Sequence, residues 1–188
     1  MRKSLLFALI LLGMGCTGAV AAEVDGIVFP PQVQLAGRSL VLNGAGIRTK
    51  FFLHIYAAAL YTEHTLPSAD AVLADGGAKR IVMHFIYDGV SQKRLAEGWN
   101  DGFEKNQDKA AMAALRPRLE RFNAMFREAH RDDVYRFDLL PDGTTGVFLN
   151  GQTLGRIEGA DFQRALLCVW LGTSPADADL KRALLGRP

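Results

Sequence analysis

The stretch LNGAGIRTKFFLHIYAAALYTE, residues 42–63, places two cations before a long apolar run. In an extended strand, successive side chains point to opposite faces. Residues 51–62 are mostly apolar at both alternating sets of positions. The run therefore predicts a strand, about twice the usual length, that is covered on both faces. Residues 43–46, with the sequence NGAG, predict a flexible joint ahead of it.

The remaining segments come in blocks of strands and blocks of helices. Alternating or β-prone runs predict strands over residues 27–29, 32–35, 39–42, 80–87, 134–140, 144–149 and 152–157. Helical spacing of apolar residues predicts helices over residues 69–74, 91–107, 109–129, 159–171 and 174–186, the last one capped by Ser174 ahead of Pro175. Because the blocks do not alternate strictly, the fold class is predicted to be α+β with a large, mainly antiparallel sheet.

The N-terminal residues are typical of a secretory signal peptide. A basic start precedes an apolar stretch at residues 5–12 and a tail of small residues. The apolar stretch is shorter than the roughly 20 residues that a membrane span needs. We therefore expect cleavage after Ala21 or Ala22, with residues 1–22 as the signal peptide and residues 23–188 as one domain in the periplasm or outside the cell. No transmembrane segment is predicted.

Lipid anchoring at Cys16 is the competing interpretation of the N-terminal segment. It is less favoured because residues 13–15 lack the aliphatic residue that such a site prefers. The 22 basic and 20 acidic residues of the chain give a net charge of +2. This balance offers no clustered basic excess for binding nucleic acid. The oligomeric state stays open.

Several kinds of site are excluded by the pattern of residues. The four histidines form no metal-binding pair at helical spacing. The glycines at 44 and 46 lack the third glycine of a dinucleotide-binding loop and precede a strand, so they offer a phosphate no helix N-terminus. No serine lies in a Gly-x-Ser-x-Gly motif. We therefore expect neither a metal nor a cofactor.

Arg48 and Tyr56 are candidates for holding an acidic head group. A guanidinium presents a charged fork that matches a carboxylate, and a tyrosine can add a hydrogen bond while its ring stays in apolar surroundings. A straight strand would separate the two residues by roughly 26 Å. A shared site therefore requires a bend between Thr49 and Ile55. The alternative is that Arg48 is an exposed edge charge and Tyr56 a core aromatic residue.

Two segments of the chain resemble the chalcone isomerase-like family. The first joins GAGIRTK at residues 44–50 to IYAAALY at residues 55–61, and the second runs from Gly151 to Gly172. The second segment, with residues 180–186, is similar to the exported bacterial branch of that family. The resemblance implies an open-faced β-sandwich: a large antiparallel sheet with helices on one face and a cleft between them. The family includes plant chalcone isomerases and plastid fatty-acid-binding proteins.

The resemblance also implies roles for particular residues. Arg48 matches the family's site arginine, which steadies an enolate in the enzymes and meets a carboxylate in the lipid binders. Tyr56 matches a tyrosine that shares this carboxylate. The second polar pair of the enzymes, a tyrosine and an asparagine, would fall near Val90 and Glu97, so this chain does not reproduce it.

The function predicted from these residues is non-catalytic binding of a fatty acid or another small amphipathic carboxylate in the cleft. Arg48 and Tyr56 would hold the head group. The tail would contact five apolar residues: Phe52 (or Leu53), Ala58, Phe85, Trp99 and Phe103. One alternative is an intramolecular lyase of the chalcone isomerase type that uses Arg48 as its electrophile. The other is a protein-interaction module whose cleft is filled by side chains.

Overall fold

The computed structural model describes residues 21–187. Most of the predicted signal peptide, including the alternative lipid site at Cys16, therefore lies outside the described residues. Between residues 21 and 187, no helix is both long enough and apolar enough to cross a membrane.

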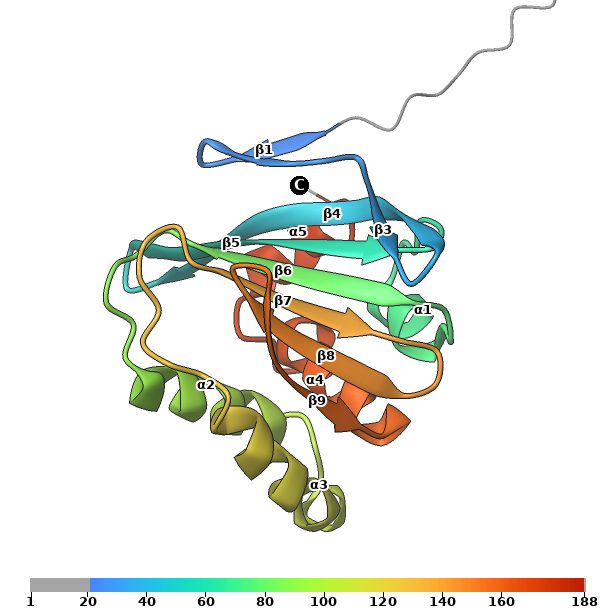
Figure 1. Ribbon diagram of the computed structural model, residues 1–188, viewed down its shortest axis with the longest axis vertical. Helices are drawn as coiled ribbons and strands as arrows, with labels where there is room; N and C mark the ends of the chain where they lie inside the picture. Colours follow the sequence, from blue (N-terminus) through green and yellow to red (C-terminus); the bar gives the residue numbers. More distant parts are fainter. Residues whose placement is uncertain (1–20, 188) are drawn as a thin grey trace, which may run out of the picture.

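One seven-stranded antiparallel sheet forms the centre of the protein (Figure 1). Every strand pairs with its neighbour in the sequence, and the strands are β3 (Gln32–Leu35), β4 (Arg38–Lys50), β5 (Leu53–Thr62), β6 (Lys79–Phe85), β7 (Val134–Leu139), β8 (Thr144–Leu149) and β9 (Gln152–Glu158). The predicted α+β class with an antiparallel sheet is confirmed.

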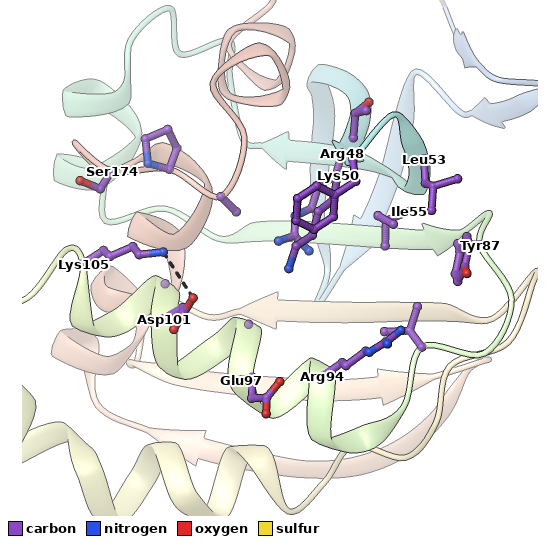
Figure 2. A pocket seen from close by; sticks show the side chains of 17 residues that line it. Arg48, Lys50, Leu53, Ile55, Tyr87, Arg94, Glu97, Asp101, Lys105 and Ser174 are labelled. Atoms are coloured by element: carbon purple, nitrogen blue, oxygen red, sulfur yellow. Dashed lines mark hydrogen bonds and ion pairs between the residues drawn. The ribbon is translucent and has the colours of Figure 1, made fainter.

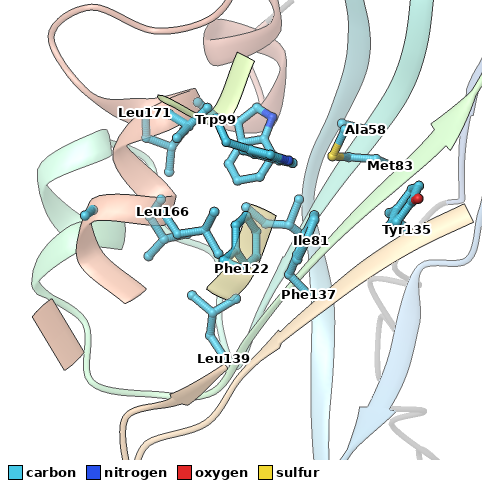
Figure 3. Close-up of a cluster of buried hydrophobic side chains, with 14 of the residues drawn as sticks. Ala58, Ile81, Met83, Trp99, Phe122, Tyr135, Phe137, Leu139, Leu166 and Leu171 are labelled. Atoms are coloured by element: carbon cyan, nitrogen blue, oxygen red, sulfur yellow. The ribbon is translucent and has the colours of Figure 1, made fainter. Parts of the chain in front are cut away.

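The helices cover one face of this sheet. They are α1 (Ala69–Ala74), α2 (Gln92–Glu104), α3 (Lys109–Asn123), α4 (Ala160–Leu171) and α5 (Ala178–Leu184). Aromatic side chains fill the space between the two layers (Figure 3). The ring of Trp99 lies 5.3 Å from that of Phe122 and 5.5 Å from that of Trp170, centroid to centroid. These contacts join α2, α3 and α4 into one core.

A short hairpin, β1 (Ala22–Val24) and β2 (Ile27–Phe29), contributes to a second, smaller core on the other face of the sheet. The central strand β5 contributes to both cores. Tyr56, Ala58 and Leu60 pack in the core beneath the helices, and the intervening alanines pack in the second core with Tyr61. The prediction that this strand is covered on both faces is confirmed.

The start of β5 differs from the prediction. Phe51 and Phe52 do not extend the strand but form a two-residue turn, so that Lys50 pairs with Leu53. Both turn residues have positive φ, +50° and +65°, which the two-residue turns of twisted hairpins require. The chain therefore reverses direction at the start of the apolar run.

Residues 43–46 are also not a flexible joint, because they belong to β4. A register shift between Leu42 and Gly44 marks a bulge at Asn43. The buried Asn43 amide donates to the Leu184 carbonyl over 2.8 Å and accepts from the Leu66 N–H over 2.6 Å. The two glycines that follow have no side chain to separate β4 from α5, so the helix lies directly on the strand.

The last helix begins later than predicted. Asp177, rather than Ser174, caps α5, because its carboxylate accepts from the N–H groups of Asp179 and Leu180. The same carboxylate also accepts from the Thr49 N–H at the end of β4 over 2.9 Å. Residues 174–176 are thereby left as a connecting segment between α4 and α5.

Replacing Gly44 with alanine will strongly destabilise the fold. The added Cβ would overlap the Ala183 carbonyl oxygen and lie 2.7 Å from the backbone of Leu184. Neither backbone atom can rotate away, so we expect a loss of at least about 3 kcal/mol in the free energy of unfolding, measured by urea denaturation. Gly76→Ala is the control, because its Cβ would meet nothing within 4 Å; its effect should stay within about 0.5 kcal/mol.

Candidate functional site

A cleft of about 670 Å³ lies between the β4–β5 end of the sheet and the helices (Figure 2). This volume is within the range of about 300 to 1,000 Å³ that is usual for small-molecule sites. One wall is the β4–β5 hairpin, another is α2, and the third is the segment of residues 174–176. The Asp177 contact with Thr49 ties this third wall to β4.

A second, smaller chamber of about 50 Å³ adjoins the cleft. Six residues line both spaces: Arg48, Ile55, Val90, Arg94, Gly98 and Ala176. The remaining walls of the chamber are largely apolar and come from β5, β6, α2 and α4. Since a water molecule takes up about 30 Å³, the chamber has room for one small chemical group. The interior beyond it is filled by packed side chains.

Arg48 lies where the cleft meets the inner chamber, directly opposite Tyr56 in the β4–β5 ladder. The bend that a shared site requires is present, because the turn at residues 51–52 brings the two strands together. The guanidinium carbon lies 5.6 Å from the centre of the Tyr56 ring. Within residues 21–187, Arg48 forms no ion pair, and its Nε is buried without a hydrogen-bond partner. Arg48 is thus a partly buried charge rather than an exposed edge residue.

Tyr56 is almost completely buried, and its hydroxyl oxygen accepts a hydrogen bond from Trp170 Nε1 over 3.0 Å. Burial raises the pKa of Tyr56, and the nearby Arg48 charge only partly opposes this effect. The hydroxyl therefore keeps its proton at neutral pH and can donate it to an acceptor. Trp99 Nε1 is a further buried donor with no partner among the described residues. Together with Arg94, four side chains with hydrogen-bond donors consequently line the small chamber.

The cleft-facing stripe of α2 was not among the residues predicted from the sequence. It consists of Arg94, Glu97, Gly98, Asp101, Gly102 and Lys105, which recur at helical spacing (Figure 2). Asp101 pairs with Lys105 over 3.3 Å, and Glu97 with Lys93 over 3.9 Å. The carboxylates of Glu97 and Asp101 therefore pair with lysines. Arg94, Arg48 and Lys50 have no carboxylate partner in the described chain. The excess of unpaired cations suits an anionic ligand.

Two glycines inside a predicted helix were the signal that the sequence offered, and the structure shows that their surroundings differ. A Cβ on Gly102 would lie 2.8 Å from a methyl group of Val169, so Gly102 permits close packing of α2 on α4. A Cβ on Gly98 would meet nothing within 4 Å. Gly98 lines both spaces, so its missing side chain widens the passage between them.

The residues predicted to contact the tail are only partly brought together. Phe85 and Trp99 line the inner chamber. Ala58 and Phe103 are fully buried and line neither space, because other core side chains separate them from it. Phe52 is 99% exposed and lies outside both spaces, whereas the alternative, Leu53, lines the cleft. The turn at residues 51–52 explains the last difference.

The described residues of this region offer little for metal binding or for the second polar pair of the plant enzymes. Residues 21–187 contain no group of three or more His, Cys, Asp or Glu side chains placed to hold a metal ion. Val90 and Glu97, which fall near the second polar pair of the plant enzymes, do line the cleft. Valine offers no hydrogen bond, and a carboxylate can only accept one.

Known proteins show the same fold. A fatty-acid-binding protein of Arabidopsis thaliana superposes with a TM-score of 0.64 at 16% sequence identity, covering 85% of this chain and 92% of that one. No curated protein matches the sequence significantly. A model of the chalcone isomerase-like family matches residues 21–186. Because this match extends over almost the whole sequence, the chain belongs to the chalcone isomerase-like family.

Proposed function

We propose that this protein is an exported, non-catalytic carrier of a fatty acid or another small amphipathic carboxylate, which it holds in the cleft. The observation that carries the proposal is the guanidinium of Arg48, which borders the cleft with a buried, unpartnered Nε and forms no ion pair among residues 21–187. A buried polar group without a partner costs about 1 to 3 kcal/mol, and more when it is charged. An anionic ligand would remove this cost. The export part rests on the signal-peptide pattern of residues 1–22.

The carboxylate head group fits at the inner chamber. A carboxylate accepts several hydrogen bonds, and the side chains of Arg48, Tyr56 and Trp99 border this space with donors available. The chamber's volume of about 50 Å³ suits such a head group and excludes a long acyl chain. The similarity to a protein described as fatty-acid binding supports the same ligand class.

The acyl tail then lies in the larger cleft and runs toward the β4–β5 turn. Apolar side chains along this route are Phe51, Leu53, Ile55, Val90, Pro175 and Ala176. Their positions replace Ala58, Phe103 and Phe52 of the predicted tail site. The tail would point outward, with the head group innermost.

Removing the Arg48 guanidinium should weaken binding of a fluorescent fatty acid, cis-parinaric acid. Hydrogen bonds to charged groups contribute about 1.5 to 3 kcal/mol, so the Kd of Arg48→Ala should rise about 10- to 150-fold. Fluorescence titration measures this change. The control is Arg156→Ala on β9, an exposed arginine outside the cleft, which should bind as the wild type does.

Equal affinities for these two variants would rule out Arg48 as the head-group site. The native ligand is identified by native mass spectrometry of protein taken from the periplasmic fraction of a bacterial host that expresses residues 1–188. Co-purified acids that are lost from Arg48→Ala but kept by Arg156→Ala would support the proposal. Recovery of the protein only from the cytoplasm would contradict its export.

Gly98→Leu should separate stability from binding. Leucine is favoured over glycine inside a helix by up to about 0.8 kcal/mol, and its Cβ meets no neighbour. The melting temperature should therefore not fall. Because the longer side chain would occupy the passage between cleft and chamber, the affinity for cis-parinaric acid should fall at least about tenfold, a change of roughly 1.4 kcal/mol. An unchanged affinity would show that the ligand does not pass Gly98.

A further inference from the structure

Two-residue turns close four hairpins in the described chain, and the sequence of one turn differs from the other three. The turns are Asp25-Gly26, Ala36-Gly37, Phe51-Phe52 and Asn150-Gly151. All eight residues have positive φ, between +48° and +82°. Glycine adopts this conformation without steric strain, while bulky side chains do not. Three turns carry glycine at the second position, and only the β4–β5 turn carries a phenylalanine there.

Phe52 gains no packing contact in return for this strained conformation. Its side chain is 99% exposed, and that of Phe51 is 83% exposed. Strain that is retained without benefit to the folded chain is a reason to look for a functional contact. The two rings are therefore suited to contact something outside the protein.

The turn stands at the mouth of the cleft. Phe51 and Leu53 are exposed and also line the cleft, so the apolar tip, which we define as residues 50–53, continues into the ligand site. Lys50 lies 5.8 Å from the centre of the Phe51 ring and has no ion pair within residues 21–187. His54 on β5 lies 2.9 Å from the Asp25 carboxylate of the β1–β2 turn, so this carboxylate already has a partner.

We propose that the apolar tip inserts into the surface of an anionic lipid bilayer and presents the cleft mouth to it. The inference deepens the proposed function, on which it rests, by naming where the amphipathic ligand is exchanged. Aromatic rings enter the boundary between head groups and acyl chains, while a lysine beside them keeps its charge among anionic head groups. An acyl tail that points outward from the chamber would then face the membrane it leaves or enters.

A lipid surface fits the tip better than a protein partner does. A stable protein interface buries about 800 Å² on each side with complementary shapes. Besides Phe51, Phe52 and Leu53, Val28 on β2 is the other large apolar side chain that is exposed in the described chain. A small protruding turn cannot form such an interface alone, whereas a fluid bilayer requires no complementary shape.

Phe52→Trp provides a direct probe of insertion. The native Trp99 and Trp170 side chains are only 4% and 1% exposed, so the new indole reports the tip. With vesicles of phosphatidylglycerol and phosphatidylcholine, its emission should shift to shorter wavelength and be quenched by brominated lipid. Pure phosphatidylcholine vesicles should give a smaller response. No spectral change with either vesicle would overturn the proposal.

Phe52→Gly separates the membrane contact from folding. Relief of the positive-φ strain should raise the melting temperature by about 2 to 4 °C, while co-sedimentation with phosphatidylglycerol vesicles should fall at least about tenfold, a change of roughly 1.4 kcal/mol. Because Phe52 lies outside the cleft, binding of cis-parinaric acid in solution should stay unchanged. Val28→Ser is the control and should sediment as the wild type does.

Vesicle binding by Phe52→Gly at the wild-type level would overturn the proposed membrane contact. The two proposals fail in different ways. Wild-type protein that binds the acid but not vesicles contradicts the membrane contact alone. Wild-type protein that binds vesicles but neither cis-parinaric acid nor any co-purified acid contradicts the ligand site alone.

Discussion

The antiparallel register between β4 and β5 is the constraint on which the site depends. It places Arg48 opposite Tyr56, and a shift by one residue would turn every side chain of the strand to the other face. The same register presents the glycines of β4 to α5 and the Thr49 N–H to Asp177. The segment before α5 is thereby held against the hairpin. One strand pair thus fixes Arg48, Tyr56 and two walls of the cleft.

The covered central strand and the need for a bend near Arg48 could be predicted from the sequence, but the turn itself could not. Phenylalanines favour strands, and nothing in a Phe-Phe pair signals positive φ. The Ser174-Pro175 pair was misleading for a similar reason, because Asp177 competes as a cap and gains the contact with Thr49. On α2, the sequence showed the apolar stripe that is buried in the structure. The polar stripe beside it had the composition of an ordinary solvent-exposed helix face, so the sequence did not predict that it lines the cleft.

The charges around the cleft favour a ligand that is already anionic. Stabilising a developing oxyanion requires donors arranged around the reacting atom. Across the cleft from Arg48, the Val90 side chain supplies no hydrogen-bond donor. Glu97 supplies a carboxylate, paired only with Lys93 over 3.9 Å, which would add a second negative charge beside the oxyanion. A permanent carboxylate at the inner chamber would instead have the donors of Arg48, Tyr56, Arg94 and Trp99 around it. These residues therefore suit binding of a fatty acid better than formation of an enolate.

The chain departs from what is locally most stable at two positions, one in the lining of the cleft and one in the turn at its mouth. Gly98 occupies a helix interior without packing against anything, and Phe52 occupies a turn position that glycine prefers. Two matched positions have a structural explanation instead: Gly102, one turn further along α2, packs on Val169, and Asn150-Gly151 closes its hairpin with glycine. Local destabilisation without a structural return often accompanies function. Its concentration at the inner passage and at the outer mouth agrees with the ligand path proposed above.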